Sequence, residues 1–153
     1  MSVAASLTEL SAEEIQACRD DPAVLPAILT DRSRPRCGLD KAWAGLRFLF
    51  DAGDLRFEAA MLDEELLEQF GPYQVNFVSP YVMRKIADDL DWEGRAADLA
   101  KHYDPERMRG IYPDIWARDG DDARDYLLSF IPALREFTGG AADRKAGAVV
   151  VIG

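Results

Sequence analysis

Histidine and cysteine are scarce in this sequence of 153 residues. It contains one histidine, His102, and two cysteines, Cys18 and Cys37. These residues form neither a Cys-x-x-Cys pair nor a cluster of metal ligands, so we expect no bound metal and no cofactor. The chain also lacks a Gly-rich phosphate loop and a nucleophile elbow. These absences favour a protein that is not an enzyme, although catalytic residues can lie far apart in a sequence.

Long apolar runs are also missing. The longest are a few residues, whereas a membrane-spanning helix needs about 20. The N-terminal residues 1–8 lack the charged and apolar regions of a signal peptide. We therefore expect a soluble, cytoplasmic protein with both cysteines reduced.

Basic residues are outnumbered by acidic ones. The chain has 18 Lys and Arg against 28 Asp and Glu, a net charge of −10. Such a charge repels phosphate backbones and anionic lipids, so neither nucleic acid nor a membrane is an expected partner. It would attract a basic protein or a cationic ligand. Alternatively, the charge only keeps the protein soluble.

The remaining composition is that of a globular domain. The hydrophobic fraction is 48% and the charged fraction 30%. A chain of this length buries enough surface to fold without a disulfide or a metal. We predict a single domain over residues 1–153.

Strand patterns occur at both ends of the chain. Val3–Glu9 is a weak candidate, whereas Ala148–Ile152 is a continuous β-branched run typical of a central strand. An unpaired strand would leave its backbone groups unsatisfied, so we expect the two ends to lie in one sheet. Tyr73–Val78 is a third candidate strand.

Helical patterns fill much of the rest. Ser11 and Glu14 form a capping box, and Ser79-Pro80 combines a cap with a proline in the first turn. Pro132 is expected to kink or break the last helix. The predicted helices are Ala12–Arg19, Pro22–Leu29, Asp40–Phe50 with Asp40 as its cap and a left-handed Gly53 at its exit, Phe57–Phe70, a helix from Pro80, Glu93–His102 and Asp121–Phe137. The predicted irregular segments are the polar loop Asp31–Arg36, a short turn or helix from Asp104 to Arg109 and a flexible link at Gly139-Gly140.

Several of these segments together resemble a known family. They are LDKAWAGLRFLF (Leu39–Phe50), GP followed by NFVSPYVMRKIADDL (within Gly71–Leu90), YDPERMRGIYPDIW (Tyr103–Trp116) and the final AVVVIG. In this order they resemble the YfbM-like family, a domain of unknown function numbered 1877. The resemblance implies a compact α+β fold, with helices packed around a small mixed or antiparallel sheet that includes both termini. It implies no activity, because the family has no established reaction or ligand.

The block Tyr112-Pro113-Asp114-Ile115-Trp116 is the best candidate for a functional loop. Proline restricts Tyr112 to an extended backbone, so the block has a defined shape. Its members Tyr112, Asp114 and Trp116 are candidate binding residues, because aromatics with a polar tip suit ligand pockets and protein interfaces. The alternative is that the loop pins a helix to the sheet, with Trp43 and Trp116 mainly structural.

A cluster of aspartates follows this loop. Asp119, Asp121, Asp122 and Asp125 do not have the spacing of a calcium loop. We take Asp121, Asp122 and Asp125 as candidate contacts for a basic partner; alternatively, they cap the helix that follows. Two further acidic stretches are Asp63 to Glu68 and Asp88 to Glu93, and the aromatic residues near the stretches are Tyr81, Trp92 and Tyr126.

His102 and the cysteines each have two interpretations. His102 is a general base or a polar residue in the last turn of a helix. Cys37 lies beside Arg36, which could stabilise a thiolate, whereas Cys18 is expected to be buried in a helix. The sequence does not decide whether the two thiols meet.

Two hypotheses for function remain. The first is a non-enzymatic acidic protein that binds a basic protein, as an antitoxin or immunity protein does. The second is a small enzyme or ligand-binding domain with a pocket near Tyr112–Trp116.

Overall fold

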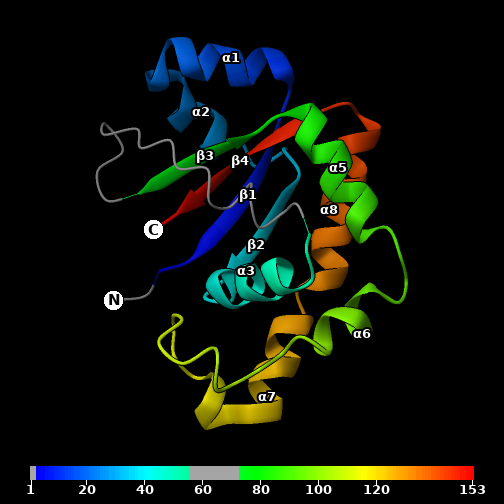
Figure 1. Cartoon of the computed structure of the whole chain (residues 1–153). Coiled ribbons are helices and arrows are strands. Elements are labelled where there is room, and N and C mark those ends of the chain that lie inside the picture. Colours follow the sequence, from blue (N-terminus) through cyan, green and yellow to red (C-terminus); the bar gives the residue numbers. More distant parts are fainter. Residues whose placement is uncertain (1–2, 56–72) are drawn as a thin grey trace.

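A computed structural model describes residues 3–55 and 73–153. Their strands form one four-stranded antiparallel sheet in the order β2-β1-β4-β3 (Figure 1). The strands are β1 (Ala5–Leu10), β2 (Arg36–Asp40), β3 (Gln74–Val78) and β4 (Gly147–Ile152). The helices are α1 (Ala12–Asp20), the 3-10 helix η1 (Pro22–Val24), α2 (Leu25–Thr30), α3 (Trp43–Ala52), α5 (Pro80–Leu90), α6 (Arg95–Ala100), α7 (Trp116–Leu128) and α8 (Ile131–Asp143). The fold is α+β, as predicted.

The two ends of the chain pair in the middle of the sheet. β1 and β4 run antiparallel, with Ala5 opposite Ile152 and Leu10 opposite Gly147. This pairing confirms the prediction for the chain ends. β4 also pairs with β3, so the β-branched run is a central strand, as its sequence indicates.

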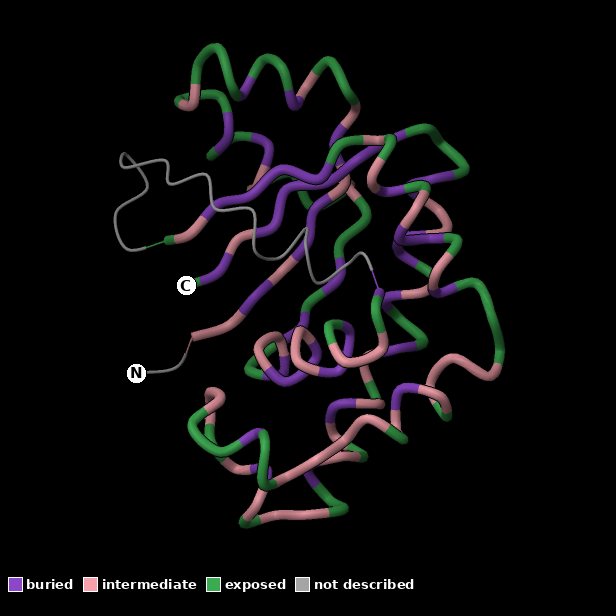
Figure 2. The backbone as a smooth tube through the Cα atoms, viewed as in Figure 1, coloured by how far each residue is buried: buried purple, intermediate pink, exposed green. Residues whose placement is uncertain are grey.

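Helices cover both faces of the sheet. Alternation along β4 places Val150 and Ile152 in a large core with α3, α5, α7 and α8. Val149 and Val151 face a smaller core under α1 and α2. Figure 2 shows the central strands buried along most of their length.

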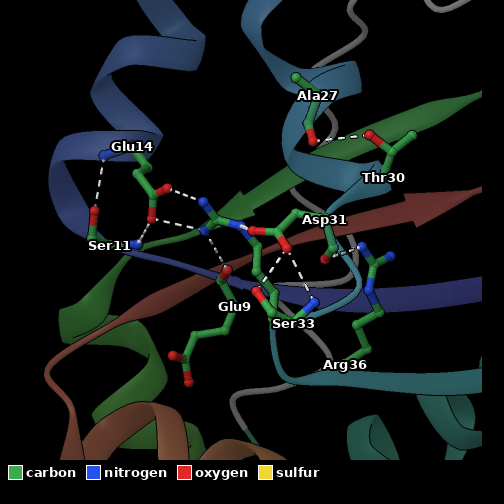
Figure 3. Close-up of polar contacts among 9 residues, drawn as sticks. Glu9, Ser11, Glu14, Ala27, Thr30, Asp31, Ser33 and Arg36 are labelled. Carbon is green, nitrogen blue, oxygen red and sulfur yellow. Dashed lines mark hydrogen bonds and ion pairs between the residues drawn. The ribbon is translucent and has the colours of Figure 1, made fainter.

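A polar cluster joins α1 to the turn before β2 (Figure 3). Ser11 Oγ accepts a hydrogen bond from the Glu14 amide at 3.1 Å, and the Ser11 amide donates to Glu14 Oε1 at 2.9 Å, which confirms the capping box. The Glu14 carboxylate also accepts from Arg34 Nη1 at 2.9 Å. This bond from Arg34 is the largest cause that lowers the pKa of Glu14 to about 2. The ion pair therefore fixes α1 against the β2 side of the sheet.

The strand β2 was not expected. The polar loop is confirmed over residues 31–35, but Arg36 already belongs to β2. In this strand only Cys37 and Leu39 are buried, alternating with exposed residues. An edge strand of this kind needs only one apolar face, so its sequence carries a weak signal.

The predicted start and exit of the third helix are wrong in detail. Asp40 does not cap α3: it ends β2 with φ 44°, and the cap position is Ala42. Gly53 is the C-cap but has φ −86°, and the left-handed residue is Asp54, with φ 59°. Aspartate tolerates this conformation better than most residues. The predicted helix Phe57–Phe70 lies outside the described residues.

The last predicted helix is two helices. α7 begins at Trp116, not at Asp121, and bends at Gly120, where φ is 52° and ψ is −120°. The helix α7 ends at Leu128, and Pro132 lies in the first turn of α8. This position suits proline because it has no amide hydrogen to donate. The break at Pro132 was predicted, but the flexible link at Gly139-Gly140 is wrong, because both glycines lie within α8.

The remaining helices differ less from expectation. Ser79 caps α5, with its hydroxyl accepting from the Val82 amide at 3.2 Å. α6 is shorter than the predicted Glu93–His102. Among the residues described, no helix has the length and apolar character that a membrane crossing requires.

Candidate functional site

The outer face of α3 carries the candidate site. The inner face, with Leu46, Leu49 and Phe50, is fully buried in the large core. The outer face presents two rows of side chains spaced by four residues, which lie next to each other on a helix. One row is Trp43, Arg47 and Asp51, and the other is Ala44, Phe48 and Ala52.

Two adjoining hollows lie along these rows. The first, which we call the aromatic hollow, has a volume of about 390 Å³. Its lining residues are Trp43, Ala44, Arg47, Phe48, Asp51, Ile111 and Tyr112. The second, the polar hollow, has a volume of about 550 Å³. Its lining residues are Asp51, Ala52, Lys101, His102, Tyr103, Asp104, Pro105 and Arg107.

The two hollows form one groove. Both are lined by Asp51. Moreover, Arg107, which lines the polar hollow, places its guanidinium carbon 5.4 Å from the ring centroid of Phe48 in the aromatic hollow. We call the two together the α3 groove. Its floor is the outer face of α3, and its wall is the segment between α6 and α7. The course of both segments can be followed in Figure 1.

Backbone atoms near the N-terminus hold two aromatic residues of the aromatic hollow. The indole Nε1 of Trp43 donates to the Val3 carbonyl at 3.0 Å, and the Val3 amide donates to the Tyr112 hydroxyl at 2.8 Å. The two rings are stacked, with centroids 6.1 Å apart and planes inclined by 30°. Both rings are therefore held in place before any ligand arrives.

Trp116 does not line the groove. It is fully buried, and its indole Nε1 donates to the Ile111 carbonyl at 2.8 Å. A Cβ at Gly45 would lie 2.8 Å from the Trp116 ring, so the indole packs directly against α3. Trp116 therefore pins the wall of the groove to its floor, the helix α3, whereas the structural interpretation of the loop predicts a contact between a helix and the sheet.

Asp114 and Tyr103 also shape the wall. The Asp114 carboxylate is exposed and accepts from the Gly110 amide at 2.9 Å, which closes the turn before Tyr112. The Tyr103 hydroxyl lies 3.0 Å from the Trp116 carbonyl and 2.9 Å from the Gly120 carbonyl. Burial is the largest cause that raises the pKa of Tyr103. Of the three loop residues predicted as binding residues, only Tyr112 reaches the groove.

The acidic cluster lies elsewhere, on α7, and most of its aspartates pair with arginines of the same helix. Arg124 contacts Asp121 at 3.4 Å and Asp125 at 3.2 Å. Arg118 forms a second pair, with Asp119, at 2.8 Å. Asp122 is exposed. Within the described ranges, no three His, Cys, Asp or Glu side chains gather as a metal site requires.

The cysteines lie on opposite faces of the sheet. Cys18 belongs to the smaller core and Cys37 to the larger one, and both are free thiols. Burial raises the pKa of Cys37 to about 11, so the thiolate suggested by its neighbour Arg36 does not form. Burial likewise raises the pKa of Cys18.

The sequence interpretation missed most of the groove. It did not identify Arg47, Phe48, Asp51 or Arg107 as site residues. A partial signal was present in α3, because the aromatic residue Phe48 lies outside the apolar face that helical periodicity predicts, whereas Trp43 lies within that face. The sequence suggests two roles for His102, a general base or a polar residue at the end of a helix. The structure places His102 just after α6, where it lines the polar hollow.

These features define a small α+β domain with a groove along the outer face of one helix. The chain belongs to the family described as "Domain of unknown function (DUF1877)", whose model matches residues 1–151. This finding confirms the family resemblance in the sequence.

A solved structure agrees with this assignment. The crystal structure of YfbM from Escherichia coli, a protein of unknown function, is similar with a TM-score of 0.74 and 17% sequence identity. The similarity covers 98% of this chain and 99% of that one. No curated protein matches the chain. At this identity, the likeness to YfbM concerns the fold alone.

Proposed function

We propose that the protein binds a small molecule with an apolar, planar body in the aromatic hollow of the α3 groove. The observation that carries the proposal is the Trp43–Tyr112 stack, in which each side chain is hydrogen-bonded to a backbone group of Val3. Rings fixed in advance lose little conformational freedom when a ligand binds. The volume of about 390 Å³ falls within the range of known ligand pockets.

The groove offers binding more readily than catalysis. Its one histidine, His102, lies in the polar hollow, and none of the described residues that line either hollow is a cysteine or a serine. We therefore propose a ligand-binding domain, acting in the cytoplasm, in preference to an enzyme.

Blocking the hollow tests this function. Ala44 lines the aromatic hollow, so the variant Ala44→Phe fills it with a ring. Ala97→Phe is the matched control, because Ala97 is exposed on α6 and lines neither hollow. The probes are 2-naphthoate and its uncharged amide, 2-naphthamide, measured by calorimetry.

We expect saturable binding to the wild type and to Ala97→Phe, and binding at least about tenfold weaker to Ala44→Phe. Melting temperatures close to the wild type would show that both variants fold. The proposal is wrong if neither probe binds the wild type, or if a folded Ala44→Phe binds both probes unchanged.

A second candidate function rests on a different surface. Tyr81 is 72% exposed and Trp92 is 52% exposed, at the two ends of α5. Exposed Asp88, Asp91 and Glu93 lie close to them in the chain, and Arg84 and Arg135 offset part of the charge of the first two. Aromatic anchors with carboxylates around them suit a basic protein partner, since charge speeds encounter and aromatics supply affinity. We propose this surface for the partner that an antitoxin or immunity protein would have.

The acidic surface of α7 belongs to the same second proposal. Asp121, Asp122 and Asp125 remain candidate contacts, although Arg124 offsets part of their charge. The test is a pull-down at low and moderate salt, repeated with Trp92→Ala and with charge reversal of these three aspartates. A basic partner that is insensitive to salt and to both changes would contradict the second proposal.

A further inference from the structure

The charge inside the α3 groove is opposite in sign to that of the chain. The whole sequence has 18 basic residues against 28 acidic ones. Among the residues that the structure describes, the two hollows are lined by the cations Arg47, Lys101 and Arg107 and by two carboxylates, Asp51 and Asp104. A cationic groove in an anionic protein is a local feature that the net charge would not produce.

The two arginines of the groove are without ion pairs in the described part of the chain. Most arginines there pair with a carboxylate: Arg34, Arg84, Arg95, Arg109, Arg118, Arg124, Arg135 and Arg144. Arg47 forms no such pair, even though Asp51 lies four residues further along the same face of α3. Carboxylates are abundant, so an arginine left unpaired in a groove is available for an anion from outside.

Arg107 is also oriented for such an anion. Its guanidinium lies over the Phe48 ring, so one face of the planar group is occupied. The N–H donors of a guanidinium point outward in its plane, where they bind a carboxylate or a phosphate through two parallel hydrogen bonds. Asp104 does not compete strongly with such an anion for the Arg107 guanidinium. Its carboxylate instead accepts a hydrogen bond from the Arg107 backbone amide at 3.2 Å and caps the turn between the two residues.

The groove is also longer than one ring system. Its floor extends from Trp43 to Ala52, which spans about 14 Å at 1.5 Å per residue. The stacked pair Trp43 and Tyr112 lies at one end, and most of the charged residues lie at the Ala52 end, together with Tyr103. A ligand that fills the groove is therefore apolar at one end and ionic at the other.

We propose that the ligand of the α3 groove is an elongated organic anion. Its planar apolar body lies against Trp43, Phe48 and Tyr112, and its acid group binds Arg47 and Arg107. The proposal rests on the ligand-binding function above and adds the chemical class of the ligand. It takes the carboxylate and phosphate forms together, since both satisfy a guanidinium.

Asp51 makes the proposal testable by a gain of affinity. It lines both hollows, is exposed, and repels an anion bound between them. Asp51→Asn should therefore strengthen binding of 2-naphthoate by roughly threefold, the effect of one charge about 6 Å away in water. The affinity ratio of 2-naphthoate to 2-naphthamide should rise by the same factor, because Asp51 acts on the charge of the probe. A cationic ligand such as 2-naphthylmethylammonium would respond in the opposite direction.

Loss of either arginine is the complementary test. Arg47→Gln and Arg107→Gln should each weaken binding of 2-naphthoate about fivefold to tenfold relative to binding of 2-naphthamide. Arg32→Gln is the matched control, because Arg32 is exposed in the turn before β2 and lines neither hollow. Calorimetry gives the affinities, and melting temperatures report folding.

Three results would overturn this inference and leave the proposed function intact. The first is equal binding of 2-naphthoate and 2-naphthamide in the groove. The second is tightest binding of the ammonium probe, which would indicate a basic ligand. The third is an Arg107→Gln variant that melts at a lower temperature but keeps the same selectivity between the two probes. This result would show that Arg107 only stabilises the fold through its contact with α3. If Ala44→Phe fails to weaken any probe, the proposed function itself is wrong.

Discussion

At the residue scale, Gly45 shows how closely the wall of the groove approaches α3. A Cβ at this position would lie 2.8 Å from the rings of Trp116 and from a methyl group of Leu127. Real Cβ atoms do not come so close, so something must shift. The absence of a side chain therefore lets α7 and the groove wall pack directly on α3.

We predict that Gly45→Ala lowers the free energy of unfolding by about 1–3 kcal/mol, the cost of overpacking a core. Gly139→Ala is the control, because Gly139 lies within α8 and a Cβ there meets nothing within 4 Å. That change should stabilise the protein by about 0.4–1 kcal/mol, because alanine reduces the freedom of the unfolded chain. Urea unfolding measures both, and a stabilising Gly45→Ala would contradict the packing described.

A second prediction at this scale concerns acid. The pKa of Glu14 is about 2 when folded, below its ordinary value of 4.5. A lowered pKa contributes stability that is present above the unfolded pKa and is lost as pH falls through the folded one. The wild type should therefore melt above Glu14→Gln at pH 5 to 7.

This difference should shrink steadily between about pH 4.5 and 2. Glu13→Gln is the control, since Glu13 is the exposed neighbour in the same turn. Melting temperatures measured across this range decide the matter. A difference that stays constant down to pH 2 would show that Glu14 acts through packing alone.

At the scale of elements, sequence patterns predicted those whose signal is local. The cap of Ser79 and the first-turn Pro80 are adjacent in the chain, so the start of α5 could be predicted. β4 was recognised because its residues Val149–Ile152 are all β-branched. β2 was missed because its single buried face contains only Cys37 and Leu39.

The groove could not be predicted because it joins distant segments. Its floor is α3, and its wall comes about fifty residues later in the chain. The sequence identified Tyr112 as a candidate binding residue, but it did not indicate which residues Tyr112 faces. Helical periodicity assigned Trp43 to the core, whereas its side chain is only partly buried and lines the aromatic hollow.

The pinning role of Trp116 gives a prediction for this wall. Trp116→Ala removes a fully buried ring and should cost about 3–5 kcal/mol. Trp92→Ala is the matched control, because Trp92 is 52% exposed and should cost less than about 1 kcal/mol. Denaturant unfolding separates the two. Equal effects would mean that Trp116 does not anchor the wall.

At the scale of the whole molecule, both chain ends hold the sheet together. β4 lies between β1 and β3, so its removal leaves both neighbours without a partner on that side. We predict that deletion of residues 148–153 abolishes cooperative unfolding and most of the far-ultraviolet circular dichroism of the fold. A truncated chain that melts at the wild-type temperature would contradict this topology.

The net charge of the whole molecule also affects how an anion reaches the groove. An anion must approach a chain of net charge −10, so its binding depends on the local cations of the groove. Salt screens the long-range repulsion more than close contacts with Arg47 and Arg107. Rising ionic strength should therefore affect 2-naphthoate binding less than it affects a basic protein on the acidic surface.

The most direct test of the central claim is to map where the probe binds. Amide chemical shifts of the isotope-labelled protein would be followed during titration with 2-naphthoate. The account predicts that the largest changes fall within residues 43–52 and at Ile111 and Tyr112, and that they saturate together. Largest changes around Tyr81 and Trp92, or at the hollow beside Leu29 and Val75, would show that the α3 groove is not the binding site.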